Sequence, residues 1–138
     1  MDKVDISVVL PVFNEQENLS PLLADLNESL TETGKTFEII FIDDGSTDNS
    51  LAIMTDLKET ESNVRVIKHR RNFGKAVALK TGFAAAKGQI SITMDGDLQD
   101  PPEMIEKFYK QWLKGYDIVY GNRVKREASF LLNISYKF

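Results

Sequence analysis

Apolar runs of strand length alternate along the chain with segments in which apolar residues recur at helical spacing. Continuous β-branched runs are typical of buried strands, and they predict five strands at "DISVVLPVF", "FEIIFI", "VRVIK", "QISITM" and "YDIVYGN". Between the first two strands, five leucines share one helical face: Leu19, Leu22, Leu23, Leu26 and Leu30. Strands that alternate with helices in this way predict an α/β fold, with a mostly parallel sheet and helices on both of its faces.

Start and stop signals predict where these helices begin and end. Asn14, with Glu17 three residues later, has the spacing of a capping box that opens the leucine helix, and Gly34 is expected to end it. The alanine-rich helix "KAVALKTGFAAAKG" is expected to stop at Gly88, and Pro102 suits the first turn of the helix in "DPPEMIEKFYKQWLKG".

The last stretch, "VKREASFLLNISYKF", is basic first and then apolar. It predicts a helix, either packed on the core or lying at an anionic lipid interface. It stops with no turn or cap, so we expect the chain to be cut from a longer parent.

Composition removes several classes of protein. The chain has 138 residues, with 42% hydrophobic and 28% charged residues, which suits one soluble globular domain or a piece of a larger protein. Its net charge of −4 gives no basic field for nucleic acid. The absence of cysteine excludes disulfides and thiolate metal sites. Without a signal peptide or a long apolar run, the chain is expected to be cytoplasmic and not to span a membrane.

An acidic cluster follows the fourth predicted strand, in "ISITMDGDLQDPPE". Asp95 and Asp97 repel each other at such short spacing, so a cation is expected between them. Mg²⁺ or Mn²⁺ binds through one or two carboxylates together with substrate phosphates, and Gly96 lets the backbone approach a ligand closely. The alternative is an acidic turn. Asp100, just before the proline pair, is better explained as a helix cap than as a ligand.

A second polar cluster, "IDDGSTDNS", follows the second strand. Its side chains could form an Asx turn and cap the next helix, or one aspartate could accept a hydrogen bond from a nucleobase. Alternation along the strand sends Asp43 and Asp44 to opposite sides, and we favour Asp44 as the ligand-facing one.

The passage "KHRRNFGKAVALKTG" places Lys68, Arg70, Arg71 and Lys75 between a strand and a helix. It is similar to a phosphate-binding loop, although His69 stands where a Walker A pattern has its first glycine. A helix N-terminus with cations nearby favours an anion, but a solvated basic loop would look the same. No catalytic role is assigned to His69.

Taken in order, "VVLPVFNEQENL", "FEIIFIDDGSTDNS", "RNFGKAVALKTGFAAAKG", "ITMDGDLQDPPEMI" and "YDIVYGNR" closely resemble the family 2 glycosyltransferases, which have the Rossmann-like GT-A fold. Within that family they look most like dolichol-phosphate mannose synthases and bacterial polyprenyl-phosphate glycosyltransferases. The resemblance covers residues 4 to 123. It implies that residues 1–123 are the nucleotide-sugar-binding part of the domain, and that residues 124–138 begin an acceptor-side or interfacial segment that is truncated.

The resemblance also implies roles for matching positions. Residues expected to bind the donor are Pro11, Phe13 and Glu15 at the nucleoside, Ile42 and Asp44 at the base, and Lys75, Asp95, Gly96, Asp97, Gln99 and Arg123 toward the diphosphate. Asp95 and Asp97 match the DXD-type element that holds Mg²⁺ or Mn²⁺. Asp97, through the metal, and Arg123 are the expected catalytic residues, because they would stabilise charge on the leaving group. The family often has tyrosine where Phe13 stands, so stacking is kept and a hydroxyl is lost.

The implied reaction transfers a sugar from a UDP-glucose-like or GDP-mannose-like donor to dolichyl or undecaprenyl phosphate, with inversion and with a metal. The "DGDLQDPPE" and "GNR" segments look more like the bacterial glucosyl-type members. A parent protein at the cytoplasmic face of a membrane, contacting its surface through the missing C-terminal region, would suit that acceptor. A non-catalytic nucleotide-binding module and a family member with a saccharide acceptor are the alternatives. A haloacid-dehalogenase-like phosphatase or a receiver domain would place the acids after the first strand.

Overall fold

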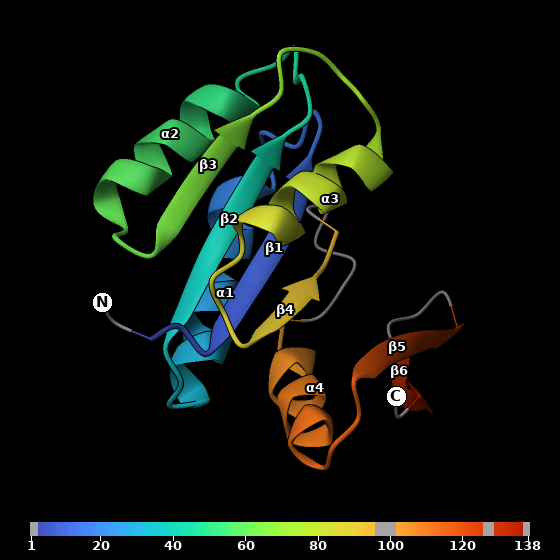
Figure 1. Ribbon diagram of the computed structural model, residues 1–138. Coiled ribbons are helices and arrows are strands. Elements are labelled where there is room, and N and C mark those ends of the chain that lie inside the picture. Colours follow the sequence, from blue (N-terminus) through green and yellow to red (C-terminus); the bar gives the residue numbers. More distant parts are fainter. Residues whose placement is uncertain (1–2, 96–101, 126–128, 137–138) are drawn as a thin grey trace.

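The computed structural model describes the backbone of residues 3–95, 102–125 and 129–136, and side chains as far as residue 121. The sheet contains β1 (Ile6–Val12), β2 (Phe37–Asp43), β3 (Val64–Lys68) and β4 (Ile90–Thr93). The helices are α1 (Leu19–Glu32), α2 (Ser50–Thr60), α3 (Lys75–Ala85) and α4 (Met104–Leu113). A hairpin of β5 (Ile118–Lys125) and β6 (Ser129–Tyr136) follows (Figure 1).

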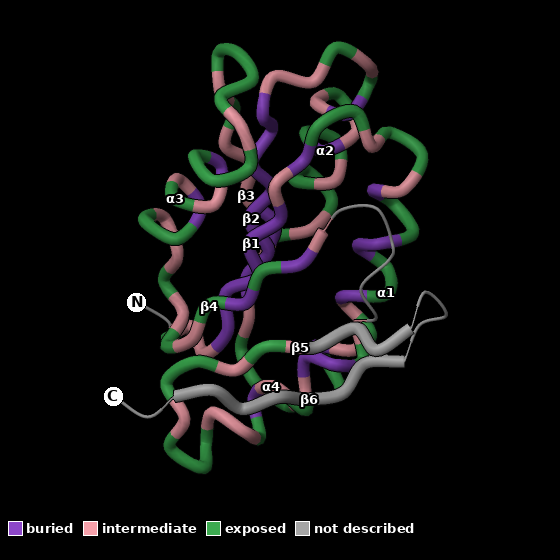
Figure 2. Tube along the Cα trace, turned by 90° about the vertical axis from the view of Figure 1, so that its right-hand side faces the viewer, coloured by how far each residue is buried: buried purple, intermediate pink, exposed green. Residues whose placement is uncertain are grey.

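The four strands are parallel and lie in the order β3-β2-β1-β4. Side chains of the central strand β1 alternate between the two faces of the sheet, as the pleat requires. Val8 and Leu10 pack against the leucines of α1 together with residues of α2 and α4. Val9 packs on the other face with Ala78 of α3. The buried residues therefore run through the middle of the sheet (Figure 2), and the predicted α/β sheet with helices on both faces is confirmed.

The register of the sheet brings the strand ends to one edge. Val12, the last residue of β1, pairs with Asp43, the last residue of β2, and Asp43 pairs in turn with Lys68 at the end of β3. In β4, Thr93 pairs with Val9, so the residues just after β4 run beside the end of β1. The ends of the four strands thus lie at the carboxyl edge of the sheet, where parallel α/β sheets bind ligands.

The capping-box prediction for α1 was wrong. The helix begins at Leu19, and its N-cap residue is Asn18, which makes no side-chain capping bond. Asn14 instead takes a left-handed conformation with φ 53°, and its side chain turns to the loop after β2. The other end of α1 is as predicted, because Gly34 follows the helix with φ 69° and its N–H donates to the Thr31 carbonyl at 3.1 Å.

Two further helix boundaries differ from the predictions. The alanine-rich helix ends at Ala85, before Gly88. A Cβ on Gly88 would lie 2.6 Å from the backbone nitrogen of Ser7, so glycine is needed there for close packing rather than to stop the helix. Pro102 precedes the N-terminus of α4, and its carbonyl accepts from the N–H of Ile105 at 3.1 Å. The capping role of Asp100 falls outside the described residues.

The predicted helix at the C-terminal end was also wrong. Residues 129–136 form β6, which pairs antiparallel with β5 in a sheet of its own. The predicted fifth strand is therefore present, but it does not extend the parallel sheet. Apolar residues at every second position, Phe130, Leu132, Ile134 and Tyr136, follow the period of a strand. This two-residue period indicates a strand, whereas the helix was predicted from the apolar content of the segment alone.

Candidate functional site

A pocket of about 270 Å³ lies at the carboxyl edge of the sheet. It is lined by Pro11, Val12, Phe13, Glu15, Asp44, Asn72, Gly74, Lys75 and Asp95. These residues come from the end of β1 and its loop, from the end of β2, from the passage into α3 and from the end of β4. Six of them were predicted from the sequence as donor-binding residues. We call this hollow the carboxyl-edge pocket.

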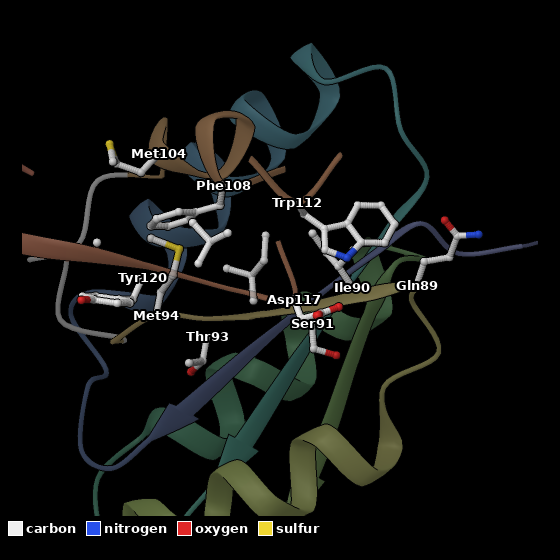
Figure 3. Close-up of a pocket in the computed structure, with 13 residues that line it drawn as sticks. Gln89, Ile90, Ser91, Thr93, Met94, Met104, Phe108, Trp112, Asp117 and Tyr120 are labelled. Carbon is white, nitrogen blue, oxygen red and sulfur yellow. The ribbon is translucent and has the colours of Figure 1, made fainter. Parts of the chain in front are cut away.

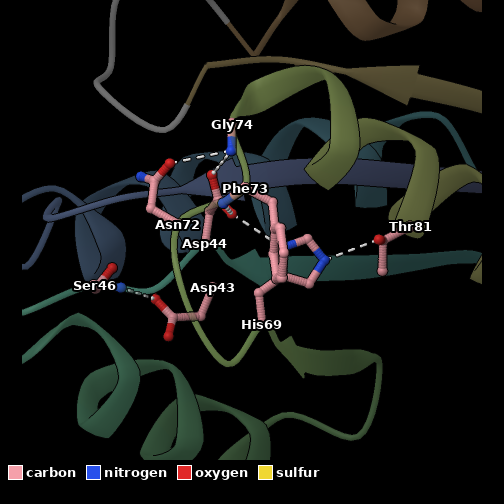
Figure 4. Close-up of polar contacts among 8 residues, drawn as sticks. All are labelled: Asp43, Asp44, Ser46, His69, Asn72, Phe73, Gly74 and Thr81. Atoms are coloured by element: carbon pink, nitrogen blue, oxygen red, sulfur yellow. Dashed lines mark hydrogen bonds and ion pairs between the residues drawn. The ribbon is translucent and has the colours of Figure 1, made fainter.

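Asp44 is held by three hydrogen bonds to its carboxylate. Its carboxylate accepts from the His69 ring nitrogen Nδ1 at 3.0 Å and from the backbone N–H groups of Phe73 at 2.9 Å and Gly74 at 3.0 Å (Figure 4). Burial by itself raises the pKa of Asp44, but these hydrogen bonds outweigh it, led by the one from His69. The pKa of Asp44 therefore lies below its ordinary value, and the group is an anion at neutral pH.

Asp43 has a different environment, although it is equally buried. Its side chain accepts from the N–H of Ser46 at 3.2 Å (Figure 4). Its carbonyl accepts from the N–H of His69 at 2.8 Å. Asp43 does not appear in the lining of the carboxyl-edge pocket. The two neighbouring aspartates thus have different roles. Asp43 holds the loop after β2, and Asp44 holds the segment that leads into α3.

The N-terminus of α3 opens onto the pocket. Gly74 is the N-cap residue with φ 98°, a conformation that favours glycine, and Lys75 is the first helical residue. The Lys75 ammonium forms an ion pair with Asp95, which also lines the pocket, and both side chains are well exposed, at 61% and 43%. Helix N–H groups and an ammonium are therefore held close to a carboxylate, a combination suited to an anionic ligand together with a cation.

The loop after β1 supplies the opposite wall. Phe13 is 45% exposed, which leaves a ring face open to solvent beside the pocket. The backbone N–H of Glu15 donates to Ser50 at 2.9 Å, while its carboxylate accepts from Asn18 at 2.8 Å. This loop is held by contacts with the start of α2 and so keeps its position relative to Asp44.

Other predicted site residues lie elsewhere or outside the described chain. Ile42 is fully buried against α3 and is not in the pocket lining. Gly96, Asp97 and Gln99 fall outside the described residues. Arg123 lies in β5, opposite Phe130 of β6. Within residues 3–95 and 102–121, no three metal-ligating side chains form a cluster, so a metal site here would use Asp95 together with residues beyond that part.

A larger hollow of about 490 Å³ lies along the outer edge of β4, between α4 and β5 (Figure 3). Phe108, Trp112 and Met94 form much of its apolar wall, and Ser91 and Asp117 add polar groups. Among the residues whose side chains the structure describes, its lining includes none of the predicted donor-binding residues. We therefore place the candidate site in the smaller carboxyl-edge pocket, where the charged groups converge.

Sequence reasoning missed two residues that organise this pocket. Asn14 joins the loops after β1 and β2, since its side-chain oxygen accepts from the N–H of Thr47 at 2.7 Å. His69 joins Asp44 to Thr81 of α3. Their partners lie 12 to 33 residues away along the chain, so no local motif could have revealed them.

None of the helices in the described part of the chain has both the length and the apolar character that crossing a bilayer demands.

Comparison with known proteins agrees with this geometry. The chain is 42% identical over 125 residues to an uncharacterized glycosyltransferase of Synechocystis sp., covering 91% of this chain and 39% of the relative. It is 41% identical over 125 residues to undecaprenyl-phosphate 4-deoxy-4-formamido-L-arabinose transferase of Pseudomonas fluorescens, covering 90% of this chain and 37% of that enzyme. The chain thus spans about two fifths of the length of these relatives.

The fold is shared with solved structures. A mannosyltransferase of Pyrobaculum calidifontis, solved in complex with GDP-Man and Mn²⁺, superposes with a TM-score of 0.68 at 24% identity, over 80% of this chain and 32% of that one. The architecture is therefore the GT-A fold that the motifs implied. The model of the glycosyl transferase family 2 matches residues 7–137, nearly the whole chain. With its fold and the charged pocket at its sheet edge, the chain belongs to glycosyl transferase family 2.

Proposed function

We propose that this chain is the donor-binding part of a glycosyltransferase that moves a sugar from a nucleotide sugar to a polyprenyl phosphate, with inversion and with a divalent metal. We assign the nucleotide-sugar-binding part to residues 1–123. The observation that carries the proposal is the convergence of Phe13, Asp44, Lys75 and Asp95 on one pocket at the carboxyl edge of the sheet. A ring face, an acceptor, an ammonium and a carboxylate together match the chemistry of a nucleoside diphosphate.

The nucleoside would lie between Phe13 and Asp44. The exposed ring of Phe13 offers a stacking surface for a base. A carboxylate has roughly four acceptor positions, and three donors already occupy Asp44. One position remains for a base N–H. This hydrogen bond to Asp44 would therefore select the nucleobase of the donor.

The diphosphate would lie at the N-terminus of α3, near Lys75. The residues present fit a hard divalent cation, because Asp95 already binds a positive group, the Lys75 ammonium. Asp95 and Asp97 would hold Mg²⁺ or Mn²⁺, which when bound supplies positive charge to the diphosphate leaving group. Lys75 would add positive charge at the diphosphate and orient it, and in our proposal Arg123 does the same.

A polyprenyl phosphate suits a site with no assigned general base. Its phosphate has a second pKa of about 6, so it is largely deprotonated near neutral pH. A phosphate oxygen would attack the anomeric carbon, the bond from that carbon to the diphosphate oxygen would break, and the nucleoside diphosphate would leave with the electron pair. One displacement of this kind inverts the configuration. The Pseudomonas relative is named for an undecaprenyl-phosphate acceptor, which supports this choice and a reaction at a membrane surface.

The test of donor binding is a thermal-shift series with UDP-, GDP- and dTDP-sugars. One nucleotide sugar should raise the melting temperature more with Mn²⁺ than with EDTA, because ligand bound to the folded state stabilises it. Asp97→Asn should remove most of that metal dependence. Equal stabilisation with and without Mn²⁺ would contradict the metal assignment, and no stabilisation by any nucleotide sugar would contradict donor binding.

The base contact is tested with a matched pair of variants. Asp44→Asn should weaken nucleotide binding by roughly 1–3 kcal/mol, the usual loss for a buried hydrogen bond to a charged group. Asp43→Asn should have a smaller effect, because it keeps an oxygen for the N–H of Ser46. A larger loss of nucleotide binding for Asp43→Asn than for Asp44→Asn would show that Asp43, and not Asp44, faces the base. In the longer parent protein, transfer to undecaprenyl phosphate, compared with transfer to a free saccharide, distinguishes the two acceptor classes.

A further inference from the structure

His69 is held between two partners from different elements. It follows the last residue of β3, and its backbone N–H donates to the carbonyl of Asp43 at the end of β2. Its ring is only 11% exposed. Ring nitrogen Nδ1 lies 3.0 Å from Oδ1 of Asp44, and Nε2 lies 2.9 Å from Oγ1 of Thr81 in α3 (Figure 4). Both nitrogens of the imidazole are therefore engaged.

The partners of His69 determine which nitrogen carries the proton. Asp44 is ionised, so its oxygens only accept, and Nδ1 must be a donor. The hydroxyl of Thr81 can donate as well as accept. In the neutral ring, Nε2 then accepts from the Thr81 O–H. This arrangement fixes the tautomer with hydrogen on Nδ1 and aims that hydrogen at the carboxylate of Asp44.

The same carboxylate also orders the loop into α3. The N–H groups of Phe73 and Gly74 donate to Asp44, and the Phe73 ring meets the His69 ring edge-on at 5.5 Å between centroids. The guanidinium of Arg71 lies over the Phe73 ring, 4.6 Å from its centre. Asp44, His69 and the loop therefore form one connected unit, and a change at His69 acts on Asp44 directly.

We propose that His69 is a positioning residue for nucleotide selection, which holds the carboxylate of Asp44 in the orientation that leaves one acceptor position toward the base. The inference rests on the proposed function of the carboxyl-edge pocket. His69 is absent from the lining of that pocket, so it acts through Asp44 and not by contact with the donor. Thr81 is the second member of the arrangement, because its hydroxyl can donate to Nε2 when that nitrogen carries no hydrogen.

The chain contains one histidine, which makes the first test direct. In ¹⁵N NMR of the ligand-free chain, recorded at a pH where the ring is neutral, His69 should give a protonated Nδ1 and an unprotonated Nε2. Thr81→Val keeps the shape of the side chain and removes the hydroxyl, so it should weaken the preference for this tautomer. A neutral ring with its hydrogen on Nε2 would overturn the proposal, because Nδ1 would then have no hydrogen to donate to Asp44.

The second test separates positioning from simple stability. Asn places its amide nitrogen near the position of Nδ1, and Gln places its own near Nε2. His69→Asn should therefore keep the donor to Asp44, whereas His69→Gln should lose it. Isothermal titration with UDP and GDP, each with Mn²⁺, should show affinity lower by roughly threefold or more for His69→Gln, as for residues coupled within one network. His69→Asn should bind like the unsubstituted chain.

Inorganic pyrophosphate with Mn²⁺ is the control ligand, since it lacks a base. His69→Gln should bind pyrophosphate normally, because the N-terminus of α3 is intact. An equal loss for pyrophosphate and nucleotide would show a collapsed loop and would overturn the positioning role, as would equal losses for the Asn and Gln variants. Unchanged nucleotide binding by His69→Gln, with binding weakened in Asp44→Asn, would refute this inference alone. No nucleotide binding by the unsubstituted chain would refute the proposed function, and this inference with it.

Discussion

The side-chain oxygen of Asn14 accepts from the backbone N–H of Thr47 at 2.7 Å and from that of Asp48 at 3.2 Å, which joins the loop after β1 to the loop after β2. Asn14 does so in a left-handed conformation, with φ 53°. Two walls of the carboxyl-edge pocket, the one carrying Phe13 and the one carrying Asp44, are thereby held at a fixed separation.

Substitutions of Asn14 should separate its hydrogen bonds from its backbone strain. Asn14→Gly should lower the free energy of unfolding by roughly 1 kcal/mol through the lost hydrogen bonds. Asn14→Ala should lower it by about 1 kcal/mol more, because alanine resists the left-handed region. Urea unfolding of both variants measures the two contributions. Equal values for Gly and Ala would mean that the loop relaxes out of this conformation.

Gly45 allows the loop after β2 to approach the loop before α3. A Cβ at this position would lie 2.4 Å from the backbone nitrogen of Asn72 and 2.6 Å from the carbonyl carbon of Arg71, and φ is 77°. Gly34 has a similar φ of 69° with no atom in the way, which makes it the matched control. Gly34→Ala should cost about 1–2 kcal/mol of stability through conformation alone.

Gly45→Ala should cost at least about 1 kcal/mol more, because the added methyl meets backbone that cannot turn aside. It should also weaken nucleotide binding, since Asn72 and Gly74 line the pocket. Chemical unfolding and titration calorimetry measure the two effects. Equal stability losses at Gly34 and Gly45 would show that the loops are free to separate.

Lys75 should matter for binding far more than for stability. Lys75→Met keeps the aliphatic part of the side chain and removes the ammonium that pairs with Asp95. Exposed ion pairs contribute about 0–1 kcal/mol, so the melting temperature should barely change. Nucleoside diphosphate affinity should fall, and its dependence on salt should become shallower. Lys80→Met, on an exposed position of the same helix, should leave both unchanged.

Glu38 should produce part of the acid sensitivity of the fold. Burial by itself raises the pKa of Glu38, but hydrogen bonds from the Lys87 N–H, from Ser7 and from Arg65 outweigh it, so the pKa lies below its ordinary value of 4.5. A carboxyl with a lowered pKa in the folded state stabilises that state above the ordinary pKa. This stabilisation is lost as the pH falls from about 4.5 through the lowered value.

Glu38→Gln should therefore be less stable than the unsubstituted chain by roughly 1–3 kcal/mol at pH 7. The difference should narrow as the pH falls below 4.5, where the unsubstituted chain also loses the charge. The pKa values of Asp5, Asp44 and Asp48 are also lowered. These groups titrate in both proteins, so their contributions cancel in the stability difference between Glu38→Gln and the unsubstituted chain. Glu28→Gln, at an exposed position of α1, is the control and should show no such narrowing.

The sequence was most informative where the signal was local and repeated. The strands of the parallel sheet follow from continuous β-branched runs, and the leucine face of α1 follows from apolar residues at helical spacing. The polar clusters after the strands indicated the right edge of the sheet, since parallel strands all end there. The roles of Asp97 and Arg123 stay predictions.

Errors arose where long-range contacts decided the outcome. Asn14 and Glu17 have capping-box spacing, yet the side chain of Asn14 accepts a hydrogen bond from a loop 33 residues away. The apolar tail was predicted as a helix from its apolar composition, although its apolar residues recur every two positions. Pairing with β5 makes it a strand. His69 gave no signal, because its importance lies in two partners that only the fold brings together.

The way α3 is attached to the sheet has a consequence for its dynamics. Only Ala78 and Gly82 of this helix are buried, and small residues contribute little apolar area. The two ends are held by polar contacts instead: Gly74 donates to Asp44 at the N-terminus, and the carbonyl of Ala85 accepts from Arg65 at 2.9 Å near the C-terminus.

Such a helix can open locally at a free-energy cost well below that of unfolding the whole domain, whereas α1, with five buried leucines, cannot. The N-terminus of α3 is also the place where a diphosphate would bind. Part of the binding free energy of a donor would then be spent on closing the locally opened form of α3. Donor binding would therefore also order the face of the sheet that α3 covers.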